Sequence, residues 1–354
     1  MKVGLIGLPG SGKSSLFALL TGTPSQATPA RSHAGIATVP DPRLAALAAL
    51  YHPGKVTPAH FEVVDMPSLL PGGDATATTR ALEAILDADA LVHVVRAFDD
   101  GHPHPLGDVD PLRDAKALFD ELLLADWALV ERRLERLRTA KKKQANHELE
   151  LAFFTRLAEH LEADGAPSDL TWTEAEQPLL RQYPLLTRKP MLVVLNVPES
   201  QAVATPGDIA AELEAWAQDH HCTLLVVSVA AELEIGRLAE EDRQLFLEDL
   251  GLEEPALARV ATAAFRLLGR ISFLTAGPKE VRAWSIPEGS TAPRAGRAIH
   301  SDIERGFIRA EVVAFADLIA CGGWTEAKRR GLVRSEGRDY IVRDGDVIEF
   351  LFHV

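Results

Sequence analysis

A segment near the N-terminus has the residue types that grip a phosphate group. The run Gly7-Leu8-Pro9-Gly10-Ser11-Gly12-Lys13-Ser14 fits the spacing Gly, four residues, Gly-Lys-Ser. Glycines allow successive backbone N–H groups to curl around phosphate oxygens, and a helix beginning near Gly12 adds its positive end. Lys13 would then neutralise the β and γ oxygens, while the Ser14 hydroxyl binds Mg²⁺. The segment therefore predicts a site for a nucleoside triphosphate.

Polar residues that follow later apolar runs are expected to complete this site. Asp65 closes one such run and would hold the metal ion through water. Asn196 closes another, and Ser228-Val229-Ala230 follows a third. The carboxyl ends of parallel strands form the crevice in which α/β sheets bind ligands. We therefore predict that Asn196 and residues 228–230 form the pocket for the base.

Short aliphatic runs predict the sheet that positions these residues. Each run is rich in β-branched or aliphatic side chains and is bounded by polar or turn residues, as buried parallel strands usually are. The runs cover residues 3–6, 61–64, 90–95, 191–195 and 224–227. A helix is predicted over residues 13–20, directly after the glycine-rich loop. The sequence thus predicts an α/β sheet with the phosphate loop at the end of its first strand.

A long helical pattern interrupts the strands between residues 110 and 182. Apolar residues recur at helical spacing on both sides of a charged bend. They are Leu118, Leu122, Leu129, Leu134 and Leu137, then Leu149, Phe153, Leu157 and Leu161. We predict an inserted pair of antiparallel helices. Basic residues gather from Arg132 to Lys143, and two interpretations stay open: a solvated helix tip, or a tip that binds RNA or a partner.

The composition limits the class of protein. The 354 residues include 37 Lys and Arg and 51 Asp and Glu, which gives a net charge of −14. This charge argues against a protein that coats polyanions in general, and we expect no DNA binding. No run of about 18 apolar residues occurs, so no membrane-spanning helix is expected. Cys222 and Cys321 have no metal-ligand spacing, and the N-terminus has no signal-peptide core. The expected location is the cytoplasm.

The last 79 residues, 276–354, predict a separate strand-rich unit. Residues 281–286 and 340–342 are strand-like, and residues 347–354 follow the turn Asp344-Gly345-Asp346. From Lys279 to Glu349 there are twelve basic and twelve acidic residues, so this tail is neutral. The acidity of the chain therefore lies in its first part.

The order of these segments resembles that of the YchF family of Obg-like P-loop ATPases, over nearly the whole chain. Beyond the phosphate loop, the resemblance is carried by several segments spread along the sequence. They are Val39-Pro40-Asp41-Pro42-Arg43-Leu44, Glu121-Leu122-Leu123-Leu124-Ala125-Asp126, Glu248-Asp249-Leu250-Gly251-Leu252, Phe273-Leu274-Thr275-Ala276-Gly277, Lys279-Glu280-Val281-Arg282-Ala283-Trp284, Gly306-Phe307-Ile308-Arg309-Ala310-Glu311-Val312, Asp339-Tyr340-Ile341-Val342 and Asp344-Gly345-Asp346-Val347. Chance does not supply so many matches in order.

The resemblance implies a P-loop NTPase G domain over residues 1–109 and 186–275. It also implies an antiparallel helical hairpin inserted over residues 110–185 and a β-grasp-like, TGS-type domain over residues 276–354. A cytosolic protein that works near ribosomes is implied, with ATP as ligand or substrate and Mg²⁺ as cofactor. The residues expected at the nucleotide phosphates are Pro9, Gly10, Ser11, Gly12, Lys13, Ser14 and Ser15. Lys13 and Asp65 are the expected catalytic residues.

The residues after the run 191–195 bear on the choice of base. Most GTPases have Asn-Lys-x-Asp there, and its aspartate accepts hydrogen bonds from guanine. This chain has Asn196-Val197-Pro198-Glu199, and the family that it resembles has Asn-x-x-Glu and prefers ATP. We therefore place Asn196, Val197 and Glu199 at the base and predict ATP as the ligand, with GTP as the alternative.

Departures from the family pattern gather on the γ-phosphate side. Gly10 and Ser11 replace an asparagine, associated with monovalent cations, and an apolar residue. The segment that should carry a metal-binding threonine is short, so that threonine is either shifted to Thr28 or missing. Asp65-Met66-Pro67-Ser68 stands where the family has Asp-x-x-Gly, and Leu69 is apolar where Ras-like enzymes have a water-orienting glutamine. Because phosphoryl transfer depends on positioning, we expect slow hydrolysis.

Two functions follow from these residues. The first is a slow ATPase whose nucleotide state controls docking on a ribosome, or on ribosomal RNA, through the helical hairpin and the TGS-type domain. The second is a nucleotide-binding adaptor with little or no turnover. The candidate RNA contacts are the basic residues from Arg132 to Lys143 and the run Lys328-Arg329-Arg330.

Overall fold

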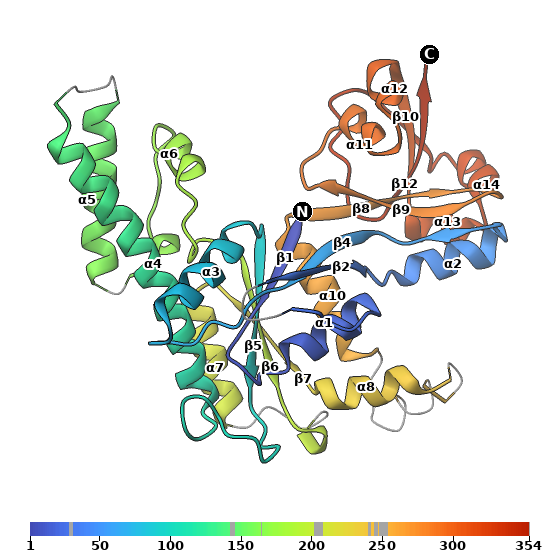
Figure 1. Ribbon diagram of the computed structural model, residues 1–354. Coiled ribbons are helices and arrows are strands. Elements are labelled where there is room, and N and C mark those ends of the chain that lie inside the picture. Colours follow the sequence, from blue (N-terminus) through green and yellow to red (C-terminus); the bar gives the residue numbers. More distant parts are fainter. Residues whose placement is uncertain are drawn as a thin grey trace. The chain divides into compact units, whose positions relative to one another are not determined.

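The computed structural model describes residues 1–27, 31–141, 146–163, 165–201, 208–239, 242–243, 247 and 254–353, with the backbone alone at 208 and 209. Two compact units make up the chain (Figure 1). The first contains Met1–Gly35 and Glu62–Val260, and the second contains Ile36–Phe61 and Ala261–Val354. The three domains bounded at residues 109, 185 and 275 stay a prediction.

The first unit is built on a sheet of order β2-β4-β1-β5-β6-β7. Its strands are β1 (Lys2–Ile6), β2 (His33–Thr38), β4 (His60–Asp65), β5 (Ala90–Arg96), β6 (Met191–Asn196) and β7 (Thr223–Val227). β1, β4, β5, β6 and β7 pair in parallel, which confirms the five strands expected from the aliphatic runs. β2 was not predicted, because its sequence His-Ala-Gly-Ile-Ala-Thr contains few residues that favour strands.

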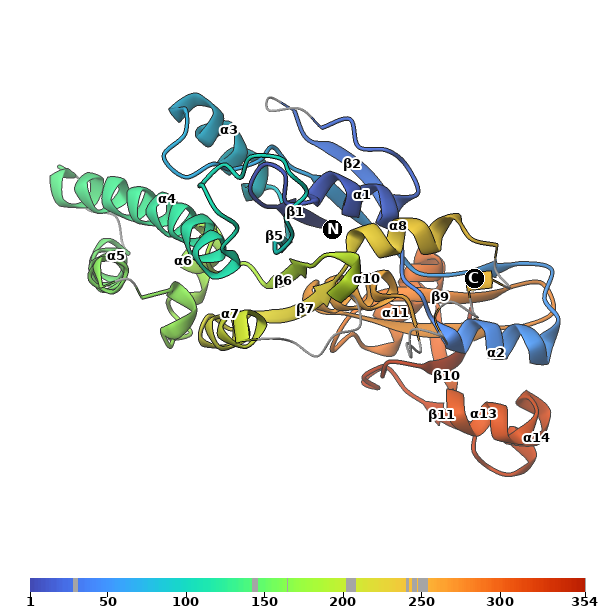
Figure 2. The ribbon, with the colours of Figure 1, turned by 90° about the horizontal axis from the view of Figure 1, so that it is seen from below.

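Helices cover both faces of this sheet. The helices of the first unit are α1 (Lys13–Thr21), α3 (Ala75–Leu86), α4 (Pro111–Thr139), α5 (His147–Glu162), α6 (Gln177–Gln182), α7 (Asp208–Asp219) and α8 (Val229–Arg237). Figure 2 shows α3, α4 and α7 on one face and α1 and α8 on the other. Aliphatic side chains of α3, α4 and α7 share one buried core with β5 and β6. α10 (Ala256–Leu267) follows later in the chain.

α4 and α5 form the predicted antiparallel hairpin (Figure 1). Asp110 starts α4 by accepting a hydrogen bond from the Arg113 backbone N–H at 3.0 Å. The hairpin has a core of its own, made of Val130, Leu134, Leu137, Phe153, Phe154, Leu157 and Leu161 among others. At the base of the hairpin, the buried Asp126 carboxylate accepts hydrogen bonds from the backbone N–H groups of Leu186 and Thr187, at 2.7 and 2.9 Å. These bonds fix α4 against the chain that enters β6.

The second unit contains a mixed sheet of order β11-β10-β12-β8-β9-β3. Its strands are β3 (Val56–Thr57), β8 (Arg270–Ala276), β9 (Val281–Pro287), β10 (Phe307–Ala314), β11 (Arg334–Glu336) and β12 (Asp346–Phe352). Its helices are α2 (Pro42–Tyr51), α11 (Ala292–Ile299), α12 (Ser301–Arg305), α13 (Phe315–Cys321) and α14 (Trp324–Arg329). α11 buries Ala292 and Ala295 against Phe273, Ile286 and Ile348 of the sheet. This strand-rich tail was predicted from the sequence.

One predicted strand of the tail is wrong. Residues 340–342 form only a single bridge, between Thr291 and Ile341. They lie between turns at 338–339 and 344–345. The Asp346 carboxylate holds the second turn by accepting hydrogen bonds from the Tyr340 hydroxyl at 2.7 Å and from the Arg343 backbone N–H at 2.9 Å. Two segments that carried the resemblance also meet in this unit, since Arg43 donates to Asp344 Oδ2 at 2.8 Å.

His93 gives the first unit an acid-sensitive core. The side chain lies in β5 with 1% exposure, and its Nδ1 has no hydrogen-bond partner in the described part of the chain. Burial lowers the pKa of His93 to about 4, whereas an unfolded histidine has a pKa of about 6.5. Stability from the neutral ring is therefore complete above about pH 6.5 and is lost as pH falls toward the folded value, by about 3 kcal/mol in total.

We expect His93→Leu to reduce the loss of unfolding free energy that occurs as the pH falls from about 6.5 toward 4. Denaturant titrations at several pH values would measure it, with His353→Leu as the control because the His353 side chain is exposed. If His93→Leu loses as much unfolding free energy at acid pH as the wild-type protein does, other groups cause the loss.

No helix within the described ranges is long and apolar enough to cross a bilayer.

Candidate functional site

The glycine-rich loop joins β1 to α1 and has the backbone that the sequence predicts. Gly12 is the N-cap of α1 and has a φ of 91°, in the left-handed region that glycine adopts without strain. A Cβ on Gly12 would lie 2.3 Å from Asn196 Nδ2, so this position also excludes any side chain by contact. Ser11 N–H donates to Leu8 O at 3.2 Å and closes the turn.

The two expected catalytic residues meet at the end of β4. Lys13 Nζ donates to Asp65 Oδ1 at 2.5 Å and to the Met66 backbone oxygen at 2.6 Å. The Lys13 side chain is 6% exposed and the Asp65 side chain is fully buried. An ammonium group has three donors, so one N–H of Lys13 is left for another acceptor. The buried pair fixes the lysine head group beside the loop.

Ser25 joins this pair and was not foreseen from the sequence. Its hydroxyl donates to Asp65 Oδ2 at 2.5 Å, so that Lys13 and Ser25 hold one oxygen of the carboxylate each. Ser25 lies 40 residues before Asp65, in a segment with no motif. Thr28, which the resemblance suggested as a metal ligand, lies outside the described residues.

Oxygen ligands suitable for a magnesium ion are present beside the loop. The Ser14 side chain is exposed at the start of α1, and the Asp65 carboxylate lies at the end of β4. Hydroxyl and carboxylate oxygens are the ligands that Mg²⁺ prefers. Among the described residues, no three His, Cys, Asp or Glu side chains gather into a metal site of their own. The residues therefore fit a Mg²⁺ ion that arrives with nucleotide phosphates, its usual mode of binding.

Residues of the altered switch segment are packed into the protein. Leu69 has 1% exposure and belongs to the core of the first unit, and Met66 is 2% exposed. Leu69 is therefore not available to orient a water molecule, and its apolar type suits its burial.

Asn196 connects the phosphate loop to the end of β7. Its Nδ2 donates to Ser11 O at 3.0 Å, and its Oδ1 accepts from Val229 N–H at 3.1 Å. The side chain is 3% exposed, so the amide holds two loops of the site together. Ser228 caps α8 by accepting from Ala231 N–H. Asn196 thus links the phosphate loop to Val229 of the predicted base pocket, and the contact of these residues with a base stays a prediction.

Val197 and Glu199 lie beyond the end of β6. Val197 is buried and its N–H donates to Val227 O at 2.9 Å, which anchors it to β7. Glu199 begins a short 3-10 helix, Glu199–Gln201, and its side chain is exposed. Ala230 is exposed as well. The role of these residues at the base stays a prediction.

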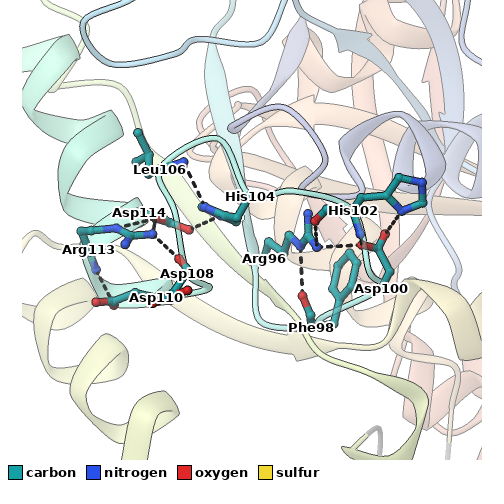
Figure 3. Close-up of polar contacts among 10 residues, drawn as sticks. All are labelled: Arg96, Phe98, Asp100, His102, His104, Leu106, Asp108, Asp110, Arg113 and Asp114. Carbon is teal, nitrogen blue, oxygen red and sulfur yellow. Dashed lines mark hydrogen bonds and ion pairs between the residues drawn. The ribbon is translucent and has the colours of Figure 1, made fainter.

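Arg96 lies close to Gly10 of the phosphate loop and was missed by the sequence analysis. Figure 3 shows its side chain beside Phe98, Asp100 and His102. Its side chain is 3% exposed, and a Cβ on Gly10 would lie 3.3 Å from Arg96 Nη1. Nη2 donates to Asp100 Oδ1 at 2.7 Å, and Nε donates to Phe98 O at 3.0 Å. The His102 backbone N–H and the Arg96 charge lower the pKa of Asp100. Arg96 therefore holds the chain after β5 in shape, close to the phosphate loop.

A second polar cluster fixes the same connection at the start of α4 (Figure 3). His104 Nε2 lies 2.8 Å from Asp114 Oδ2, and both side chains are at most 3% exposed. Asp114 Oδ1 also accepts from Arg113 Nε and Nη2, at 3.1 and 2.7 Å. Arg96 thus holds the start of the connection from β5 to α4, close to the phosphate loop, and Asp114 holds its end at the hairpin helix. No motif in the sequence marks these residues.

Comparisons with known proteins cover the whole chain. A family model described as a 50S ribosome-binding GTPase, MMR_HSR1, matches residues 2–125. The model YchF-GTPase_C, described as a protein of unknown function, matches residues 270–353. The ribosome-binding ATPase YchF of Bacillus subtilis is 40% identical over 365 aligned positions, which span 100% of both chains. The chain belongs to the YchF family.

Other YchF proteins agree with this assignment. The ribosome-binding ATPase YchF of Haemophilus ducreyi is 39% identical over 100% of this chain and 99% of its own. The structure of the Schizosaccharomyces pombe YchF GTPase matches with a TM-score of 0.85 and 27% identity, over 99% of this chain and 97% of that one. The resemblance and the α/β fold with a P-loop GTPase domain are therefore confirmed.

Proposed function

We propose that this YchF family chain binds Mg²⁺-ATP in the glycine-rich loop, hydrolyses it slowly and associates with ribosomes under control of the bound nucleotide. The observation that carries the proposal is the buried Lys13–Asp65 pair, which lies beside a loop with the P-loop spacing. A cytosolic location agrees with this function. The curated relatives from Bacillus subtilis and Haemophilus ducreyi are named ribosome-binding ATPases, which supports both activities.

The residues around the loop have distinct tasks in this proposal. Backbone N–H groups of residues 10–15 cradle the phosphates, and the third donor of Lys13 turns to a phosphate oxygen. Ser14 would hold Mg²⁺ directly and Asp65 through water, after Asp65 exchanges its bond with Ser25. The ion supplies charge neutralisation on the phosphates. Because Asp65 is bonded to both Lys13 and Ser25, nucleotide binding must rearrange the segment after α1, which makes it a switch.

ATP is the preferred nucleotide in this proposal, with GTP as the alternative. Glu199 stands where the guanine-reading aspartate of most GTPases lies, and adenine has no matching pair of donors for a carboxylate. The relatives carry both names, since the curated bacterial proteins are called ATPases and the fission yeast structure is called a GTPase. The glutamate at this position supports ATP over GTP.

The second candidate function is an adaptor that binds nucleotide without turnover. The burial of Leu69 favours it, because this position offers no polar group to orient the attacking water. A single-turnover assay separates the two functions: enzyme in excess over Mg²⁺-ATP, with phosphate release followed over time. We expect slow release from the wild-type protein, faster when ribosomes are added. Binding of ATP without any release, with and without ribosomes, would establish the adaptor instead.

Ribosome association is proposed to use the α4–α5 hairpin, with the second unit as an additional contact. The two basic candidates differ in their surroundings. Lys328 pairs with Glu311, and Arg329 and Arg330 both pair with Glu326, which leaves little free charge in the tail. The basic residues near the end of α4 therefore have the stronger claim to contact RNA. Lys142 and Lys143 lie outside the described residues.

A further inference from the structure

An arginine-lined pocket lies on the hairpin, away from the phosphate loop. It has a volume of about 240 Å³ and is lined by Leu129, Arg132, Arg133, Arg136 and Tyr183. The first four come from one face of α4, and Tyr183 directly follows α6. Three guanidinium groups and an aromatic ring thus line one small hollow.

The arrangement of charges on α4 separates this face from the rest of the helix. At about 100° per residue, Leu129, Arg132, Arg133 and Arg136 fall within an arc of about 100°. The same rule places Glu131 and Glu135 outside that arc, turned away from the pocket. Within the described residues no carboxylate lies within 4.0 Å of Arg132 or Arg136. In a chain of net charge −14, this is an unusual local excess of positive charge.

The pocket is held in shape before any ligand arrives. Arg133 forms an ion pair with Glu150 of α5, and its guanidinium lies 5.3 Å from the centre of the Tyr183 ring. The Tyr183 ring packs edge-on against Phe154 at 4.9 Å. Arg132 Nε donates to Ala128 O at 2.9 Å, which leaves its two terminal nitrogens for a ligand. Arg133 Nε is buried with no partner in the described part of the chain.

We propose that this pocket binds one phosphodiester group of an RNA strand. Guanidinium forks match the oxygens of a phosphate with two parallel hydrogen bonds. A volume of about 240 Å³ is below the range of about 300–1,000 Å³ that drug-sized ligands occupy, so it suits one group of a polymer better than a free cofactor. Arg132 and Arg136 supply the unpaired charge, and Arg133 and Tyr183 form the wall. The proposal rests on the proposed ribosome association and names its contact.

The test measures RNA affinity of the full chain with Arg132→Ala and Arg136→Ala combined. The probe is a fluorescein-labelled RNA hairpin, followed by anisotropy over a series of salt concentrations. We expect the affinity to fall about tenfold, and the slope of log K against log salt to become less steep by about one, as for the loss of one phosphate contact. Arg138→Ala is the control, because it removes one positive charge from the opposite side of α4, and Arg132→Ala alone gives the comparison at equal charge. Circular dichroism and ATP binding verify that each variant is folded.

Each possible result either supports or overturns the proposed phosphate site. If the double variant binds the RNA hairpin as tightly as Arg138→Ala does, the pocket is not a phosphate site. If the double variant loses ribosome co-sedimentation but keeps its affinity for naked RNA, the pocket contacts an acidic protein and the RNA proposal is overturned. If the wild-type chain binds the RNA through these arginines but does not sediment with ribosomes, the pocket stands and the ribosomal function fails.

Discussion

Lys13→Ala is expected to lower the single-turnover rate of ATP hydrolysis by at least about a hundredfold. Lys13 is the cation that the loop places beside the phosphates, and it is already fixed by Asp65 and the Met66 oxygen. Without it, the charge that develops on the phosphates during transfer loses its main protein counter-charge. Phosphate release under single-turnover conditions, with ATP binding measured in parallel, gives the result.

The stability of this variant needs its own measurement. Removing Lys13 leaves the fully buried Asp65 without its cation, and breaking a buried ion pair costs about 3–5 kcal/mol. Lys189→Ala is a suitable control, since Lys189 is also partly buried and donates to the backbone oxygens of Leu86 and Ala88. We expect Lys189→Ala to lower stability while hydrolysis per folded molecule is unchanged. Wild-type hydrolysis by folded Lys13→Ala would show that the measured activity does not come from this site.

Gly12→Ala is expected to weaken nucleotide binding by at least about a hundredfold, because it distorts the loop that cradles the phosphates. The new Cβ would lie 2.3 Å from Asn196 Nδ2. Asn196 must then release Ser11 O or Val229 N–H, both of which it holds at present. The loop and the end of β7 would separate, and both belong to the proposed nucleotide site.

Gly22→Ala gives a matched control for Gly12→Ala. Gly12 and Gly22 cap the two ends of α1, with φ angles of 91° and 68°, so alanine at either position costs about 1–2 kcal/mol of backbone strain. A Cβ on Gly22 meets no atom within 4 Å. Gly22→Ala should therefore lose stability but bind nucleotide normally. Equal losses of affinity in the two variants would mean that backbone strain, and not the contact with Asn196, controls the loop.

Features that repeat or have fixed spacing could be predicted from the sequence. The phosphate loop has a set spacing, and the buried strands of the first sheet are continuous aliphatic runs. The hairpin could be predicted from the helical spacing of leucines such as Leu134 and Leu137, and these leucines do form its core with α5. Asp65 could be singled out because an acidic residue closes a buried run. It lies beside Lys13, and its role at a metal ion stays a prediction.

Contacts between irregular segments could not be predicted. Ser25 meets Asp65 across 40 residues, and Arg96 meets Gly10 through the fold of the sheet, so neither pairing leaves a periodic pattern. β2 was missed because alanine and glycine give a weak strand signal, and its strand is fixed by pairing in the sheet. The prediction of a strand at residues 340–342 was wrong for the opposite reason. These residues are aromatic and β-branched, yet they lie between two turns and form only one bridge, at Ile341.

The N-terminal loop is proposed to bind a magnesium-chelated purine triphosphate. Isothermal titration of the full chain with ATP, and separately with GTP, in millimolar magnesium measures this directly. We expect saturable binding of ATP, tighter than that of GTP, which is lost in Gly12→Ala. Absence of measurable affinity for either nucleotide in the folded wild-type protein would contradict it.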